Sequence, residues 1–149
     1  MSVIYSQAWY EDMKRLINGS AAFSRVAPRE RVRMTLEVMG DDRSPYVPAG
    51  TAIYFLVELD AGRVATYEPL PERHDGTGLT FRFTAPATVW ERIAAGLHDP
   101  IAAGLRGEIR IRGDMRFLMT NADAVKTLVD LYSHQVETEW PKGRPPYPA

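Results

Sequence analysis

The order of patterns in the second half of the chain restricts its fold more than any other feature of the sequence. Residues 79–84 and 109–112 alternate apolar and polar side chains, which is typical of half-buried strands. Between them, residues 86–97 carry apolar side chains at helical spacing, and Asp99-Pro100 supplies an N-cap followed by proline at the first position of a second helix. Two helices therefore separate two strands, which argues against a sheet built in one continuous run of strands.

The first half of the chain predicts one helix followed by a three-stranded meander. Residues 6–18 carry apolar side chains at helical spacing, and Gly19 is expected to end this helix in a left-handed conformation. The three strands that follow are expected at residues 32–38, 51–59 and 64–67. The second of them is apolar on both faces, so we expect it at the centre of the sheet. A turn at residues 60–62 joins it to the third strand as a hairpin.

The end of the chain predicts a long helix and then a tail. Asn121 is expected to cap this helix, whose apolar stripe consists of Val125, Leu128, Val129, Tyr132 and Val136. Residues 141–149 contain four prolines and are expected to be extended or disordered. We therefore expect one α+β domain at residues 1–140, with a sheet and helices packed on one face, and a Pro-rich tail at residues 141–149.

Composition excludes several classes of function. A length of 149 residues suits one domain with one sizeable core. The longest apolar run, residues 52–57, is far shorter than the roughly 20 residues that span a bilayer, so we expect a cytoplasmic protein. The absence of cysteine excludes disulfides and thiolate chemistry, and the net charge of −1 argues against a nucleic-acid partner. The histidines have no metal-ligand spacing, so no metal site is expected; they are His74, His98 and His134.

A run of residues in the second half carries a family resemblance. It consists of Phe81-Arg82-Phe83, Trp90-Glu91-Arg92-Ile93, Gly96-Leu97-His98-Asp99-Pro100, Ala103, Gly107-Glu108-Ile109-Arg110-Ile111, Gly113-Asp114 and Leu118. This run resembles the hallmark residues of the sterol carrier protein 2 (SCP2) sterol-binding domain family. The resemblance implies one mixed five-stranded sheet in the order helix, meander, crossover, strand, helices, strand, helix. It also implies helices on one face that enclose an apolar cavity, as in a bacterial-type single-domain member.

The same resemblance implies a function in binding rather than catalysis. An SCP2-like cavity takes a sterol, fatty acid, acyl-CoA or similar apolar molecule, and neither an enzymatic reaction nor a cofactor is expected. Homodimerisation and transient membrane contact are left open. The residues expected to line the cavity are Met34, Leu36, Phe55, Phe81, Phe83, Trp90, Ile101, Met115, Met119, Leu128 and Tyr132. Periodicity alone favours a solid core at these positions, and only the resemblance favours a hollow one.

Two other functions compete with this interpretation. A cone-shaped α+β enzyme would use Asp114 as a pocket carboxylate with a raised pKa. A scaffold would dock other proteins through the last helix and the tail, and it would have a filled core.

Arginines in the polar phase of the strands could form a basic patch for an anionic ligand; they are Arg33, Arg82, Arg110 and Arg112. Thr35, Glu37 and Glu108 share that phase, so cross-strand ion pairs on a solvated face are the simpler expectation.

Overall fold

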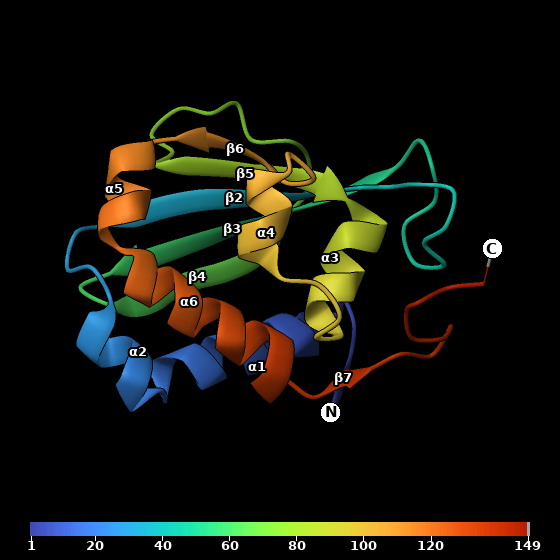
Figure 1. The fold of residues 1–149 in the computed structure, drawn as a ribbon, viewed down its shortest axis with the longest axis horizontal. Coiled ribbons are helices and arrows are strands. Elements are labelled where there is room, and N and C mark those ends of the chain that lie inside the picture. Colours follow the sequence, from blue (N-terminus) through green and yellow to red (C-terminus); the bar gives the residue numbers. More distant parts are fainter. Residues whose placement is uncertain (149) are drawn as a thin grey trace.

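The structure is a computed structural model that describes residues 1–148 (Figure 1). Its main sheet has five strands: β2 (Val32–Met39), β3 (Ala52–Asp60), β4 (Arg63–Leu70), β5 (Phe81–Pro86) and β6 (Arg110–Gly113). Its helices are α1 (Gln7–Asn18), α2 (Ala21–Val26), α3 (Ala87–Ala94), α4 (Pro100–Leu105), α5 (Met115–Thr120), α6 (Ala122–Asp130) and the π-helical turn η1 (Leu131–Gln135). Two short strands, β1 (Ser2–Val3) and β7 (Thr138–Glu139), pair in parallel. Within residues 1–148, every helix is too short or too polar to span a bilayer.

The strand order confirms the predicted α+β class and the mixed sheet. The order is β4-β3-β2-β5-β6, in which β2, β3 and β4 form the antiparallel meander, and β5 returns by a crossover to lie parallel to β2. The predicted central position of the second strand of the meander was wrong. The middle strand is β2, because β5 pairs with the edge of β2 that the meander leaves free. β3 is apolar on both faces because it also lies inside the sheet, with Phe55, Leu56 and Val57 all buried.

Helix ends follow the local chemistry of the sequence in some places and depart from it in others. Asp99 caps α4 with a hydrogen bond from the Ile101 amide to Asp99 Oδ1 of 2.9 Å, as the Asp-Pro step predicts. Gly19 does not take the predicted left-handed conformation; its φ is −87°, and its amide donates to the Arg15 carbonyl. A second N-cap, Ser20, starts α2 at once, so the chain continues in a right-handed turn.

A separate helix, α5, which the sequence patterns did not predict, precedes the final helix, and the final helix runs through α6 and η1 close to its predicted extent. Asp114 caps α5, accepting a hydrogen bond from the Phe117 amide at 3.0 Å. Asn121 makes no side-chain cap for α6; its amide Nδ2 instead donates to the Phe117 carbonyl at 2.9 Å. The side chain that would have capped α6 is therefore occupied in closing α5.

The helices lie over one face of the sheet, and the other face is partly covered by a loop. Figure 1 shows α1, α3, α4 and α6 together in front of the strands. On the opposite face, Glu37 is only 1% exposed, so the predicted solvated face of ion pairs was wrong at this position. Arg82 and Arg73 both donate to the Glu37 carboxylate, and Thr84 Oγ1 donates to it at 2.9 Å. The loop that carries Arg73 also packs against this cluster, since Arg82 Nη2 donates to the His74 carbonyl at 2.8 Å.

Candidate functional site

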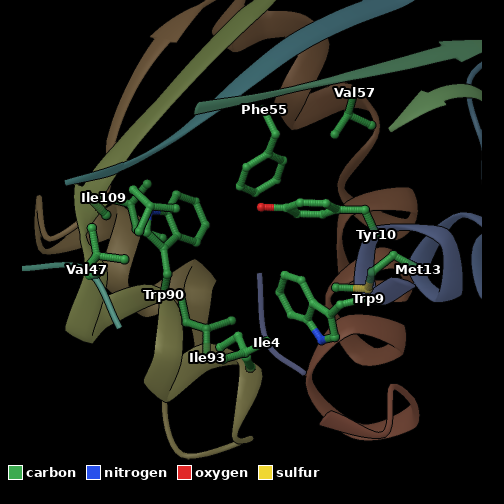
Figure 2. Packing of buried hydrophobic residues seen from close by; sticks show 14 of the residues in the cluster. Ile4, Trp9, Tyr10, Met13, Val47, Phe55, Val57, Trp90, Ile93 and Ile109 are labelled. Atoms are coloured by element: carbon green, nitrogen blue, oxygen red, sulfur yellow. The ribbon is translucent and has the colours of Figure 1, made fainter. Parts of the chain in front are cut away.

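The hydrophobic core contains a partly open cavity of about 130 Å³ between the sheet and the helices. Its floor is formed by alternate residues of β2 and β3, because successive side chains of a strand point to opposite faces. Its walls come from α1 and α3, and its roof comes from α6 and η1. Figure 2 shows part of this region, with Phe55 pointing down from the sheet toward Trp90 of α3 and Trp9 of α1.

Six of the residues expected from the sequence meet around this cavity: Met34, Leu36, Phe55, Trp90, Leu128 and Tyr132. The structure places the other five outside the lining. Phe81 is buried beside the cavity in a second apolar cluster, and Phe83 is half-buried in contact with both clusters. Ile101, Met115 and Met119 are 38%, 44% and 75% exposed. The two methionines belong to α5, a helix that the sequence patterns did not separate from its neighbours.

Helix α1 supplies the largest group of cavity-lining residues that the sequence patterns did not predict. Met13, Leu16 and Ile17 line the cavity at spacings of three and four residues, which places them on one face of the helix. Their helical periodicity was visible in the sequence and marked them as a buried face. What periodicity does not reveal is which part of a buried face borders empty space. Val57, Leu59 and Tyr67 were missed for the same reason.

The chemistry of the lining is that of an apolar binding site. The lining residues carry polar side-chain atoms only at Tyr67, Tyr132 and Trp90, and Trp90 Nε1 already donates to the Glu37 carbonyl at 3.0 Å. Burial raises the pKa of Tyr67 and of Tyr132 far above the ordinary value, so both phenols are neutral. No carboxylate, imidazole, amine or guanidinium from residues 1–148 lines the cavity. Its wall can hold an apolar molecule but offers no acid, base or metal ligand.

The cavity is smaller than a typical site for a small-molecule ligand. Such pockets measure roughly 300–1,000 Å³, several times the 130 Å³ found here. A lipid therefore requires the cavity to expand. The roof is the element most suited to move, because α6 and η1 face the cavity through side-chain packing, whereas β2 and β3 of the floor are joined to their neighbours by backbone hydrogen bonds. A ring contact between Trp9 and Tyr132, 5.8 Å between centroids, holds η1 down on α1.

Most of the polar residues considered for other functions form helix caps or ion pairs in the structure. Asp114 is exposed and caps α5, so it does not form the buried pocket carboxylate that a cone-shaped enzyme would need. His98 pairs with Glu108 at 3.1 Å. Of the four arginines in the polar phase, Arg33 pairs with Glu58 at 2.9 Å and Arg82 pairs with the buried Glu37, while Arg110 and Arg112 are exposed.

A fully buried carboxylate, Glu91 of α3, connects three distant segments of the chain. Its Oε2 accepts hydrogen bonds from Tyr5 at 2.7 Å and Ser44 at 2.8 Å, and its Oε1 accepts one from Tyr147 at 2.6 Å. Burial raises the pKa of Glu91, although these three hydroxyl donors act in the opposite direction. The tail also contacts α3 through Arg144, which donates to the Ala95 carbonyl at 2.5 Å.

Replacing Glu91 with glutamine should change how stability depends on pH. Because the folded-state pKa of Glu91 is raised above its ordinary value of 4.5, its ionisation opposes folding. The contribution of protonated Glu91 to stability is complete below pH 4.5 and is lost as the pH rises through the folded-state pKa. We therefore expect the free energy of unfolding of Glu91→Gln, relative to that of the original protein, to increase as the pH rises above about 4.5. Denaturant melts across this range measure the difference, and a constant difference would contradict the expectation.

Comparisons with known proteins agree with this architecture. The sequence profile of the SCP-2 sterol transfer family matches residues 29–126. No curated protein matches the chain. A crystal structure of sterol carrier protein 2 is similar with a TM-score of 0.75 at 20% identity, covering 88% of this chain and 98% of that chain. The solution structure of a conserved hypothetical protein from Thermus thermophilus, described as possibly a sterol carrier protein, has a TM-score of 0.75 at 20% identity, covering 94% of each chain.

A more distant structure has the same fold. The sterol carrier protein domain 2 of Helicoverpa armigera is similar with a TM-score of 0.52 at 18% identity, covering 89% of this chain and 91% of that chain. At these identities the likenesses establish the fold.

Proposed function

Because this chain belongs to the SCP-2 sterol transfer family, we propose that it binds a lipid or similar apolar molecule in the cavity between its sheet and its helices. It acts as a carrier or sequestering protein and catalyses no reaction. The observation that carries the proposal is an unfilled space at the centre of the fold whose lining is apolar and uncharged. A buried apolar space favours an apolar occupant, because burial removes the ligand's hydrocarbon surface from water.

Binding requires the roof to lift, and the lining is suited to this. Met13 and Met34 have flexible unbranched side chains, which can repack around ligands of different shape. Outward movement of α6 and η1 would extend the cavity along the sheet toward Phe81 and Phe83. Of the residues predicted from the sequence, those proposed to contact ligand are thus the six that already line the cavity, joined in the open form by Phe81 and Phe83 from β5. Ile101, Met115 and Met119 are proposed to form the rim.

Exposed apolar side chains on α4 and α5 suggest where a lipid enters. Leu105 and Met119 are 86% and 75% exposed. Exposed arginines lie close to them in sequence: Arg106, Arg110, Arg112 and Arg116. Apolar side chains accompanied by basic residues favour contact with an anionic membrane surface. We propose that this surface makes a transient membrane contact. A homodimer and a cytoplasmic location stay predictions from the sequence.

The proposal is tested by asking whether the protein carries and takes up lipid. Mass spectrometry of the organic extract of natively purified protein should reveal a co-purified lipid in stoichiometric amount. After delipidation, an apolar fluorescent fatty-acid or sterol probe should bind at about 1:1 with micromolar affinity, or about −8 kcal/mol. A scaffold with a filled core would bind no probe saturably, and that result would overturn the proposal.

Leu128→Ala distinguishes a roof over a cavity from a packed core. In the cavity the substitution enlarges an existing space, so the free energy of unfolding of the delipidated protein should fall by less than about 2 kcal/mol, while probe affinity or chain-length preference changes. Leu56→Ala is the matched control, since Leu56 is buried but does not line the cavity. It should cost about 2–5 kcal/mol and leave probe affinity unchanged. Denaturant melts and probe titrations of both variants give the answer, and equal effects on affinity would contradict the assignment.

A further inference from the structure

One residue of the cavity wall also faces the outside of the molecule. Leu16 of α1 lines the cavity, and it is the residue that the cavity shares with an open depression on the surface. Met13 and Ile17, its neighbours in the lining, are 2% and 5% exposed, whereas Leu16 is half-buried. The rest of the depression is formed by the N-terminus, the outer side of α1 and the end of the roof; its residues are Met1, Asp12, Arg15, Gln135 and Glu137. The Leu16 side chain therefore stands between the interior and solvent.

The seam between the roof and α1 is apolar. Helix α1 and η1 lie against each other (Figure 1), and the ring contact of Trp9 with Tyr132 belongs to this seam. Within residues 1–148, no hydrogen bond or ion pair joins the roof to α1, α3 or the sheet. Helix α1 is fastened to β4 instead, where Asn18 Oδ1 accepts from the Val64 amide at 2.8 Å and Asn18 Nδ2 donates to the Val64 carbonyl at 3.1 Å. Because apolar contacts have no fixed direction, the roof can move away from α1 without breaking a hydrogen bond.

We propose that the cavity has a second mouth between α1 and η1, closed by the Leu16 side chain, through which a ligand exchanges with the surrounding water. This inference rests on the proposed function of lipid binding and adds a route and the residue that controls it. The mouth is separate from the surface of α4 and α5 that is proposed to contact a membrane. It opens when η1 moves outward and the Leu16 side chain turns to another rotamer, which clears the wall between the depression and the cavity.

The two sides of this mouth suit a molecule with one polar end. On the outside, the depression carries the charged side chains of Asp12, Arg15 and Glu137 and is open to water. On the inside, the lining behind Leu16 is apolar. A lipid can therefore pass its hydrocarbon chain through the mouth while its polar end stays hydrated. This path avoids burying a polar group without hydrogen-bond partners, which is costly.

Exchange kinetics of the delipidated protein test the gate in the absence of membranes. A gate changes association and dissociation in the same direction, whereas a residue that only contacts the bound ligand changes mainly the dissociation rate. In stopped-flow measurements with cis-parinaric acid, we expect Leu16→Ala to raise both rates about three- to tenfold and to change the dissociation constant by less than about threefold. Leu36→Ala is the matched comparison, since Leu36 lines the floor of the cavity away from the depression. It should weaken binding through faster dissociation alone.

A reversible cross-link tests the movement of η1. The sequence has no cysteine, so Arg15→Cys and Gln135→Cys together place one pair of thiols on opposite sides of the depression. Joining them with a bismaleimide that contains a disulfide should lower both exchange rates about tenfold, and reducing the linker should restore them. Glu11→Cys with Arg15→Cys is the control, because a cross-link between these exposed residues, one turn apart on α1, leaves η1 free.

The two measurements separate the mouth from lipid binding itself. An unchanged association rate in Leu16→Ala, or unchanged exchange in the protein cross-linked between α1 and η1, would overturn the inference while lipid binding stands, and the ligand would then pass along another edge of the roof. Failure of cis-parinaric acid to bind the original protein would overturn the proposed function instead.

Discussion

Replacing Glu37 with alanine should lower the free energy of unfolding by about 3–5 kcal/mol, which is the usual effect of removing one partner of a buried ion pair. The Glu37 side chain is 1% exposed and the Arg82 side chain 11%. Without the carboxylate, the Arg82 guanidinium keeps only the His74 carbonyl, to which it donates at 2.8 Å, as a hydrogen-bond acceptor in the described chain. Thr84 Oγ1 loses its acceptor as well. The cost therefore comes mainly from a charge left buried without compensation.

Denaturant melts of Glu37→Ala and of Arg15→Ala measure this effect against an exposed pair. Arg15 pairs with Asp12 on the surface of α1, and its side chain is 75% exposed. Its removal should change stability by no more than about 0.5 kcal/mol. If Glu37→Ala were as mild as Arg15→Ala, the carboxylate would have to be accessible to water in solution, and the described covering of this face by the loop would be wrong.

Gly113→Ala is the second substitution with a large expected effect, because both the backbone and the space around it require glycine. The φ of Gly113 is +142°, and an added Cβ would lie 2.1 Å from the Thr80 carbonyl oxygen. Backbone strain of about 1–3 kcal/mol and overpacking of about 1–3 kcal/mol both apply, for a loss of roughly 2–6 kcal/mol. The residue ends β6 opposite Phe81 and leads directly into α5.

Gly107→Ala separates the two contributions. Gly107 has a φ of +78°, and no atom lies within 4 Å of the position of an added Cβ, so only conformational strain of about 1–2 kcal/mol is expected there. Thermal or denaturant unfolding of the two variants should show the larger loss for Gly113→Ala. Losses of equal size would mean that the close approach of β6 to Thr80 relaxes without cost.

Local patterns predicted most of the elements because each depends on neighbouring residues. Asp99-Pro100 fixed the start of α4, and alternation located β2 and β5 to within a few residues. The burial of Glu37 could not be predicted in this way. In an alternating strand a glutamate indicates a solvated face, and the loop that covers it comes from residues 71–80, far along the chain. Asn121 shows the same limit, since two helices compete for one side chain.

The cavity was the least predictable feature. Met13, Phe55 and Leu128 have the periodicity of core residues whether the space between them is filled or empty, because periodicity records only which side of an element is buried. Six of the eleven residues that the family resemblance led us to expect lie around the cavity, and five do not. Tyr10 gave no signal in the sequence. Its buried hydroxyl has no hydrogen-bond partner among residues 1–148, which becomes visible only when its neighbours in space are known.

The pairing of β1 with β7 has a consequence for how the molecule completes its folding. Trp9 Nε1 donates to Thr138 Oγ1 at 3.0 Å, across 129 residues of sequence. Contacts between such distant segments carry a large entropy of loop closure, so they form late and are among the first to open. Trp9 also packs against Tyr132 in the roof of the cavity. Transient separation of the two chain ends would thus loosen η1 while the sheet stays intact. Such partial unfolding would also open a path for a ligand into the cavity.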